Sequence, residues 1–257
     1  MKKLLILLSM LFCFTVHAQT ETLNWYMDGN VYTTTQCESG NDILLPTTPT
    51  KRGYTFKGWA SYQPIEYLES TGTQYIDTGV VPNLSDTKVN VVFMVKTYPY
   101  DEFLFGAGSG ITGSRYWALL SGSLIQVGYG SRYYNIYNNL SLASIYKYDI
   151  STNNTEIIFK LTSLDNGDVV VLFNAPLESK DSISTISLFS TNSVQTTAKA
   201  FSGRIYSAQI YDNNILVRDF IPVLDPDGVP CMLDRVEGKF YYNAGTGQFI
   251  AGPVIGE

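Results

Sequence analysis

The sequence predicts an all-β protein in which a small N-terminal module precedes a larger antiparallel β-sandwich of the jelly-roll kind. Apolar and polar residues alternate with a period of two in almost every segment, and helical spacing is not sustained over any long stretch. Gly, Asn, Asp and Ser separate these segments at intervals of roughly ten residues, which is typical of sandwiches and jelly rolls. Because βα alternation is missing, we expect no dinucleotide-binding crevice.

The composition is that of a folded protein with few charges. Hydrophobic residues make up 45% of the chain and charged residues 16%, whereas average proteins have about 25% charged residues. Ser, Thr, Asn and Gly must therefore provide most of the solubility, and this composition disfavours disorder and a coiled coil.

Residues Met1 to Ala18 have the features of a secretory signal peptide. Lys2 and Lys3 form a basic start, Leu4 to Val16 is apolar, and a small residue ends the segment. The apolar stretch is shorter than the ~20 residues of a spanning helix, so we expect no membrane insertion. We expect cleavage after Ala18 and a mature protein that is secreted or held at the cell surface of a bacterium.

The mature chain would contain no histidine, because the single histidine is His17. This excludes Ser-His-Asp and Cys-His catalysis and His-ligated zinc. Loss of Lys2 and Lys3 changes the formal net charge from −6 to −8. We therefore expect no nucleic acid among the partners, since phosphate binding depends on Lys and Arg.

The segment from Thr87 to Thr97 shows the strand pattern most clearly. Val89, Val91, Phe93 and Val95 share one face, and the other face mixes polar and apolar residues. We expect this strand to be buried on one side and partly buried on the other.

A β-hairpin is predicted between Thr155 and Phe173. Ile157, Phe159 and Leu161 alternate as the inward residues of its first strand. Asp165-Asn166-Gly167-Asp168 then supplies a turn with positive φ, and Val169 to Phe173 returns. The further expected strands are Gln74 to Thr78, Phe103 to Gly106, Tyr116 to Leu120, Leu124 to Tyr129, Ile145 to Ile150, Ile186 to Ser190, Arg204 to Tyr211 and Leu216 to Pro222.

Turn residues divide the chain into modules. We expect a signal peptide at 1–18, a small module at 22–60, a linker at 61–64 and a sandwich domain at 65–255. Cys37 and Cys231 fall in different modules, so two free cysteines are favoured over a disulfide, although an exported compartment permits one.

The segment from Leu23 to Ala60 resembles the Listeria-Bacteroides repeat, also called the internalin B-type repeat. Gly53-Tyr54-Thr55-Phe56-Lys57-Gly58-Trp59 is the most specific match, and Trp25-Tyr26, Asp28-Gly29 and Tyr32 agree with it. The resemblance implies a small β-grasp-like module of cell-surface proteins. Tyr54, Phe56 and Trp59, together with Trp25, can form most of a miniature core.

The segment from Ile65 to about Gly252 resembles the concanavalin A-like, or laminin G-like, jelly rolls of bacterial surface and phage-associated proteins. Glu66 to Gly79 looks like the opening strands of such a domain, and Phe201 to Phe220 looks like its closing strands. The resemblance implies that the domain binds glycans, proteins or calcium, or serves as a scaffold, because such a fold does not determine the function.

A cluster of aromatic and polar residues is the candidate ligand site. Sugars offer apolar CH faces beside many hydroxyls, so aromatic rings next to Asn and Arg side chains suit them. Packing between strands is the competing interpretation of the same tyrosines. The candidate ligand-binding residues are Trp117, Tyr129, Arg132, Tyr133, Tyr134, Asn135 and Tyr137, next to Tyr116, Asn138 and Asn139.

No cofactor is expected, although calcium stays open. Asp225-Pro226-Asp227-Gly228 offers paired oxygens but lacks the ligand spacing of a calcium loop, so a plain turn is favoured. Asp77, Asp212 and Asp219 are further candidate calcium ligands at the rim of the sandwich, and a structural role in a loop or turn is again the alternative.

Catalysis is not expected. Two carboxylates would be the remaining route in this architecture, and no Glu-x-Asp-x-Glu strand is present. The sequence therefore indicates a secreted binding protein that recognises a glycan or a cell-surface protein. A structural or protein–protein interaction module without glycan binding is the alternative, and a glycoside hydrolase is a third interpretation.

Overall fold

The computed structural model describes residues 20–27, 30–38, 41–53, 56, 59, 61–108, 114–122, 124–137, 140–153, 155–178, 182, 184–192 and 199–255. Contacts divide the chain into two compact units, Met1–Trp59 and Ala60–Glu257. Within the described residues all regular structure is β-strand, and no helix has the length and apolar character needed to cross a membrane.

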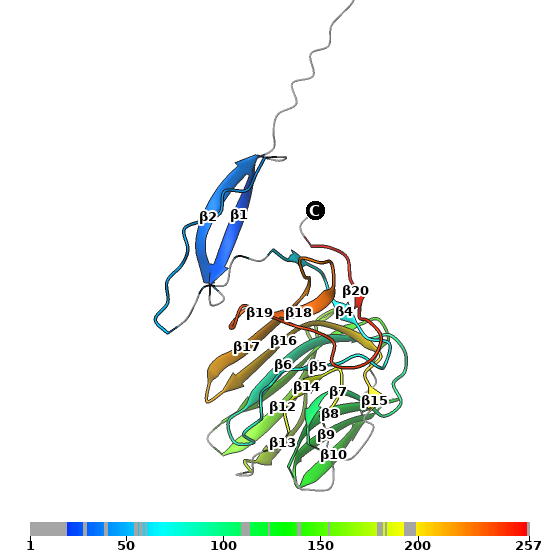
Figure 1. Cartoon of the computed structure of the whole chain (residues 1–257). Helices are drawn as coiled ribbons and strands as arrows, with labels where there is room; N and C mark the ends of the chain where they lie inside the picture. Colours follow the sequence, from blue (N-terminus) through cyan, green and yellow to red (C-terminus); the bar gives the residue numbers. More distant parts are fainter. Residues whose placement is uncertain are drawn as a thin grey trace, which may run out of the picture. The chain divides into compact units, whose positions relative to one another are not determined.

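Twenty strands occur in the described part of the chain (Figure 1). Their bounds are β1 (Thr20–Met27), β2 (Asn30–Glu38), β3 (Gln63–Pro64), β4 (Leu68–Glu69), β5 (Ile76–Asp77), β6 (Lys88–Val95), β7 (Glu102–Ala107), β8 (Arg115–Ser121), β9 (Leu124–Gly130), β10 (Arg132–Tyr137), β11 (Ile145–Thr152), β12 (Glu156–Ser163), β13 (Val169–Pro176), β14 (Ser187–Leu188), β15 (Lys199–Ala200), β16 (Gly203–Asp212), β17 (Ile215–Leu224), β18 (Pro230–Asp234), β19 (Lys239–Tyr241) and β20 (Ile250–Ala251).

The first unit contains the antiparallel hairpin of β1 and β2. Trp59 contacts aromatic rings of the same unit: its ring centroid lies 5.0 Å from that of Trp25, 5.2 Å from that of Phe56 and 5.9 Å from that of Tyr32. The Trp25, Phe56 and Trp59 rings were all expected in this core. The miniature aromatic core expected from the repeat is confirmed for these three residues. Tyr54, the fourth expected member, lies outside the described residues.

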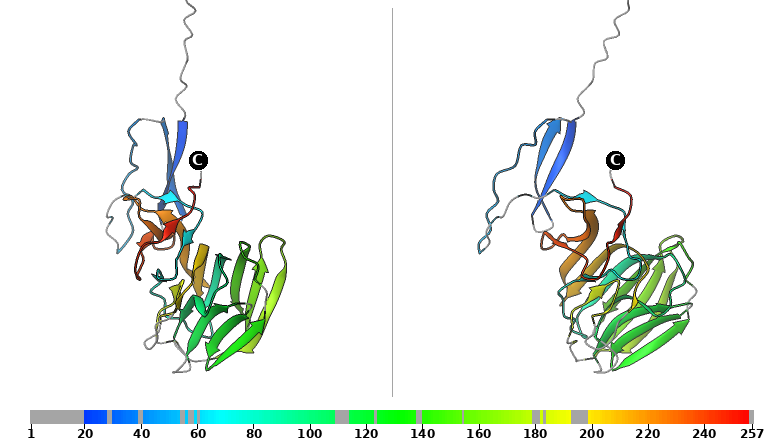
Figure 2. Two further views of the ribbon diagram at one scale, coloured as in Figure 1. Left: turned by 90° about the vertical axis from the view of Figure 1, so that its right-hand side faces the viewer. Right: turned by 45° about the vertical axis from the view of Figure 1, so that its right-hand side comes forward.

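The second unit contains two sheets (Figures 1 and 2). In the described part, the small sheet has the order β10-β9-β8-β7-β14-β5, with β15 beside β7. The large sheet has the order β13-β12-β11-β6-β16-β17-β18-β19, with β3, β4 and β20 joined to it. Every pair of these strands is antiparallel except β7 with β15, which is parallel. The all-β, essentially antiparallel sandwich is therefore confirmed.

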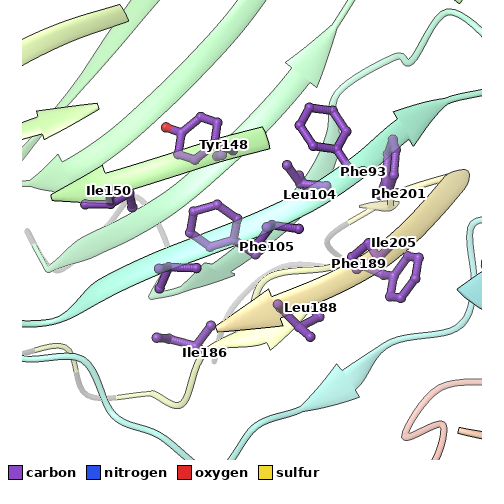
Figure 3. Close-up of a cluster of buried hydrophobic side chains, with 14 of the residues drawn as sticks. Phe93, Leu104, Phe105, Tyr148, Ile150, Ile186, Leu188, Phe189, Phe201 and Ile205 are labelled. Carbon is purple, nitrogen blue, oxygen red and sulfur yellow. The ribbon is translucent and has the colours of Figure 1, made fainter. Parts of the chain in front are cut away.

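Aromatic and aliphatic side chains fill the space between the two sheets (Figure 3). Phe105 of the small sheet and Tyr148 of the large sheet meet edge to face, with ring centroids 5.4 Å apart. Tyr129 and Phe159 make a second such contact at 5.9 Å. On β6 the predicted inward residues, of which Phe93 is one, are all fully buried.

The hairpin of β12 and β13 confirms the predicted turn. Thr162 pairs with Val169, and the Ser163 N–H donates a hydrogen bond of 2.8 Å to the Asp168 carbonyl oxygen. Gly167 has φ +77°, a conformation that favours glycine at this position.

The structure differs from the sequence-based expectation at short and irregular strands. Residues 61–64 were expected to be a linker, yet Gln63 and Pro64 form β3 and pair with β17. Strands β10, β18 and β19 were not expected either.

Cys37 and Cys231 are both free, and burial raises the pKa of the Cys231 thiol to about 12.

The small sheet is closely packed on its outer face as well. Trp117 of β8 points away from the core but is only 7% exposed, and it meets Phe103 edge to face at 5.4 Å. Its indole lies against Gly128 of β9, where a Cβ atom would overlap the ring. Glycine is therefore required at position 128 by the close approach of the indole.

We expect Gly128→Ala to destabilise the second unit by about 2 kcal/mol, because the added methyl group must displace the Trp117 indole. Chemical denaturation of the purified mature protein measures the change. Asn135→Ala, at an exposed position of neighbouring β10, is the matched control and is expected to change the stability by less than about 0.5 kcal/mol. Equal stability of Gly128→Ala and the wild type would contradict this close packing of the indole.

Candidate functional site

The predicted aromatic cluster is divided between the two faces of the small sheet. Tyr116 and Tyr129 point into the core, and their hydroxyls donate hydrogen bonds of 2.7 Å to the carbonyl oxygens of Thr87 and Leu84. Burial raises the pKa of both tyrosines. Tyr129 is 2% exposed, so the structure places this predicted ligand residue in the core. Trp117 is also packed, on the opposite face.

Strand β10 carries the exposed members of the cluster. Tyr133 is 56% exposed, and the Arg115 guanidinium carbon lies 5.9 Å from its ring centroid. Asn135 is exposed two residues further along, on the same face of the strand. Arg132 is exposed but alternates to the other face. Among the candidates whose side chains the structure describes, Tyr133 and Asn135 are the two exposed residues that lie together on the outer surface.

The remaining members do not extend this surface. Tyr134 faces inward and stacks on Phe173 of β13, with ring centroids 4.2 Å apart and planes 27° apart. The side chain of Tyr137 lies outside the described part of the chain, as do Asn138 and Asn139.

A separate hollow of about 490 Å³ lies in the second unit. The hollow lies next to the end of β5. Arg218, which lines it, donates a hydrogen bond of 3.1 Å from Nε to the carbonyl oxygen of Thr78, the residue that follows β5. β5 is the edge strand of the small sheet, so β18 and β19 of the large sheet continue beyond it. The residues that line the hollow are Asp77, Gly79, Arg218, Glu237, Lys239, Phe240, Tyr241, Tyr242 and Ala244.

Arg218 is held by acceptors on several sides. Besides Thr78, it donates 2.7 Å bonds from Nη1 to the Val217 carbonyl oxygen and to Oε1 of Glu237. The hydroxyl of Tyr241 donates to the other carboxylate oxygen of Glu237 at 2.9 Å. Burial, followed by the Glu237 hydrogen bond, raises the pKa of Tyr241 to about 12. The guanidinium is therefore fixed in place before any ligand arrives.

A buried carboxyl group lies behind Arg218. Asp234 is fully buried, and its Oδ1 accepts hydrogen bonds from the backbone N–H groups of Asp219 and Val236 at 2.8 and 3.1 Å. Its Oδ2 has no hydrogen-bond partner within the described residues and lies 3.7 Å from Arg218 Nε. Burial raises the pKa of Asp234, although both backbone bonds and Arg218 act in the opposite direction.

Lys239 supplies a further donor to the hollow. Its Nζ lies 4.8 Å from the ring centroid of Tyr241, and the ammonium forms no ion pair with any described residue. Asp77 supplies an acceptor: within the described part of the chain its Oδ1 accepts from the N–H of Gly79, and its Oδ2 has no bonded partner. The Arg218 and Lys239 cations, the Asp77 carboxylate and the Tyr241 ring thus lie at one open hollow.

The rim aspartates do not form a metal site in the part of the chain that the structure describes, where no group of three or more His, Cys, Asp or Glu residues could hold an ion. Asp225 Oδ1 accepts hydrogen bonds from the N–H groups of Asp227 and Val229. This is the geometry of an Asx turn, which agrees with the plain-turn interpretation of the segment.

The sequence analysis missed the hollow, although one signal was present. Lys239-Phe240-Tyr241-Tyr242 places a cation beside three aromatic residues. This four-residue segment alone does not show that it lies at the edge of a sheet or that Asp77 and Arg218 lie opposite it. The pairing of strands that are far apart in the sequence brings these residues together.

A family model matches the N-terminal part of the chain. Residues 22–80 match the family model of the Listeria-Bacteroides repeat domain. This match confirms the repeat predicted from Gly53 to Trp59, and it continues past the first unit over β3, β4 and β5 of the second. No curated protein matches the chain.

Solved structures that resemble the chain include β-sandwich proteins of several sources. A candidate carbohydrate-binding protein from Bacteroides ovatus is 10% identical, with a TM-score of 0.47; the match covers 75% of this chain and 62% of that one. Domains LG4-5 of the mouse laminin alpha1 chain are 14% identical, with a TM-score of 0.39 and coverages of 73% and 47%. This chain therefore spans less than two thirds of either structure. A SAP-like pentraxin from Limulus polyphemus is 6% identical, with a TM-score of 0.42 and coverages of 74% and 93%.

We expect Tyr129→Phe to cost about 1–2 kcal/mol of stability, because a buried carbonyl group and a half-buried N–H group lose their partner. The Tyr129 hydroxyl donates to the carbonyl of Leu84 and accepts a 2.9 Å hydrogen bond from the N–H of Glu178. Tyr133→Phe, at the exposed neighbouring position, is expected to change the stability by less than about 0.5 kcal/mol. Chemical denaturation distinguishes the two variants, and equal stabilities would contradict the assignment of Tyr129 to the core.

Proposed function

We propose that this is an extracellular, non-catalytic binding protein that recognises carbohydrate in the hollow beside Arg218. The observation that carries the proposal is the convergence of the Tyr241 ring with the Arg218 guanidinium, the Lys239 ammonium and the Asp77 carboxylate around about 490 Å³. The signal-like segment Met1 to Ala18 and the internalin B-type resemblance support a location outside the cell.

The polar lining suits a neutral, hydroxyl-rich ligand. Each sugar hydroxyl both donates and accepts, and the hollow offers donors on Lys239 and Arg218 and an acceptor on Asp77. Aromatic rings contribute apolar surface for the CH face of a sugar. A strongly anionic sugar would approach Asp77 and Glu237 as well as the cations, so neutral sugars are favoured.

Binding without catalysis is part of the proposal. Glu237 is engaged by both Arg218 and Tyr241, and Asp234 is held behind Arg218 by backbone N–H groups. Neither carboxylate is therefore available as a general acid or base in the way that glycoside hydrolysis requires. The surface formed by Arg115 of β8 and Tyr133 of β10 is a second candidate for contact with a partner, favoured by the exposure of Tyr133.

The first experiment is a glycan and polysaccharide array with the purified mature chain, Gln19 to Glu257. We expect binding of a neutral glycan, and we expect Lys239→Ala to weaken it about tenfold, because a hydrogen-bond donor is lost, which is about 1.4 kcal/mol. Tyr133→Ala, on the small sheet, is the matched control and should bind like the wild type.

Three outcomes would contradict the proposal. Loss of binding in Tyr133→Ala but not in Lys239→Ala would place the site on β10. A blank array with a folded, monodisperse protein would favour the protein–protein alternative. Release of shortened glycans during prolonged incubation would contradict the non-catalytic assignment.

A further inference from the structure

Three consecutive residues at the end of β5 bring polar groups to the hollow. Asp77 is the last residue of β5, and it lines the hollow together with Gly79. Between them, the Thr78 hydroxyl donates a hydrogen bond of 2.7 Å to the carbonyl oxygen of Ile186, while the Thr78 carbonyl oxygen accepts from Arg218 Nε. Thr78 therefore fixes this short segment and connects it to the guanidinium.

One end of the Arg218 guanidinium is left unused beside Gly79. Nε and Nη1 of Arg218 have protein acceptors, whereas Nη2 has no hydrogen-bond partner within the described residues. A Cβ atom built on Gly79 would lie 3.9 Å from Nη2, so this nitrogen is close to the backbone of the segment. Because Gly79 has no side chain, the space next to the unused N–H groups stays open.

Asp77 offers an unused acceptor near the same glycine. The Gly79 N–H donates a hydrogen bond of 3.0 Å to Asp77 Oδ1, which fixes the carboxylate, and φ of +70° at Gly79 allows the chain to turn in this way. Within the part of the chain that the structure describes, Asp77 and Arg218 form no ion pair with each other, since Arg218 pairs with Asp234 and Glu237. A free donor and a free acceptor therefore lie at one hollow without satisfying each other.

We propose that Asp77 and Arg218 together recognise two adjacent hydroxyl groups of a sugar, with Gly79 keeping the space for them open. One hydroxyl donates to Asp77 Oδ2, and its neighbour accepts from Arg218 Nη2. Hydrogen bonds to charged groups are stronger than those between neutral groups, so this pair would contribute much of the selectivity. The inference rests on the proposed function and adds its substrate class, which is glycans with an accessible vicinal diol. A carboxylate in place of the donor hydroxyl would be repelled by Asp77.

Two substitutions test the acceptor and the open space separately. Asp77→Asn keeps Oδ1 for the Gly79 N–H and replaces the free acceptor with an amide group that donates. Gly79→Asn places a side chain beside Arg218 Nη2, and Asn tolerates positive φ better than most residues. Gly167→Asn is the matched control, since Gly167 has φ +77° and a Cβ atom there would meet nothing within 4 Å. Gly167 lies in the turn between β12 and β13, at the opposite end of the large sheet from β19.

The first test compares neutral glycans, such as oligosaccharides of mannan and cellulose, before and after mild periodate oxidation. Periodate cleaves the carbon–carbon bond between two adjacent hydroxyl-bearing carbons, so it removes vicinal diols. We expect the wild type to bind the oxidised glycans about tenfold more weakly or not at all. Binding that survives oxidation would overturn the diol inference and leave the proposed function in place, whereas a wild type that binds no untreated glycan would contradict both.

The second test is a cycle between protein variants and monodeoxy derivatives of the sugar that the wild type binds, measured by calorimetric titration. Removal of either of two adjacent hydroxyls should weaken wild-type binding about tenfold, and Asp77→Asn should weaken it about as much. In Asp77→Asn, removal of the donor hydroxyl should have no further effect, because its partner is already lost.

The variants also show what would overturn the inference. Gly79→Asn should weaken binding of the intact sugar about tenfold, and Gly167→Asn should bind like the wild type. A general structural role of Asp77 would make the effects of Asp77→Asn and of each deoxygenation multiply, which would contradict direct recognition. Unchanged binding in Gly79→Asn, with folding checked by chemical denaturation, would contradict the role of the open space.

Discussion

Aromatic contacts between the two sheets of the second unit are the constraint on which its other features depend. Two pairs of rings connect the sheets: Phe105 contacts Tyr148, and Tyr129 contacts Phe159. Each such ring buries about 150–250 Å². Because side chains alternate along a strand, the choice of inward ring also decides which residue faces outward. Tyr116 points inward on β8, so Trp117 must lie on the outer face, where Gly128 provides the space.

The unequal width of the two sheets explains where the hollow lies. The small sheet ends at β5, whereas the large sheet continues through β17 to β18 and β19. On β17, Arg218 shares the inward face with Phe220, but it comes at the margin, where the facing sheet stops. An inward position without a facing strand can hold a charged side chain if polar groups satisfy its charge. For Arg218 these groups are the carbonyl oxygens of Thr78 and Val217 and the carboxylate of Glu237. The hollow is therefore a consequence of sheet geometry together with a few polar residues.

The sequence predicted what depends on local pattern and missed what depends on pairing. Alternation found β6 and the hairpin of β12 and β13, because a buried face and a Gly turn leave clear signals in neighbouring residues. It could not separate Tyr129 in the core from Tyr133 on the surface, since both are tyrosines in alternating segments and only the strand register fixes their faces. The hollow was missed for a related reason: Asp77 and Lys239 are far apart in sequence, and no local pattern brings them together.

Asp234 shows why the hollow resembles a binding site more than a part of the core. Its pKa is raised because burial disfavours the charged form. A carboxyl group whose pKa is higher in the folded than in the unfolded state stabilises the fold most at low pH, and this contribution is lost as the pH rises through the folded pKa. Above the folded pKa the carboxylate is therefore a cost to folding that the surrounding core offsets. An apolar residue would avoid that cost but would leave Arg218 without the carboxylate 3.7 Å from its Nε. Retention of a costly buried charge beside an opening is a pattern found at functional sites, and in this protein its effect is to fix the guanidinium that lines the hollow.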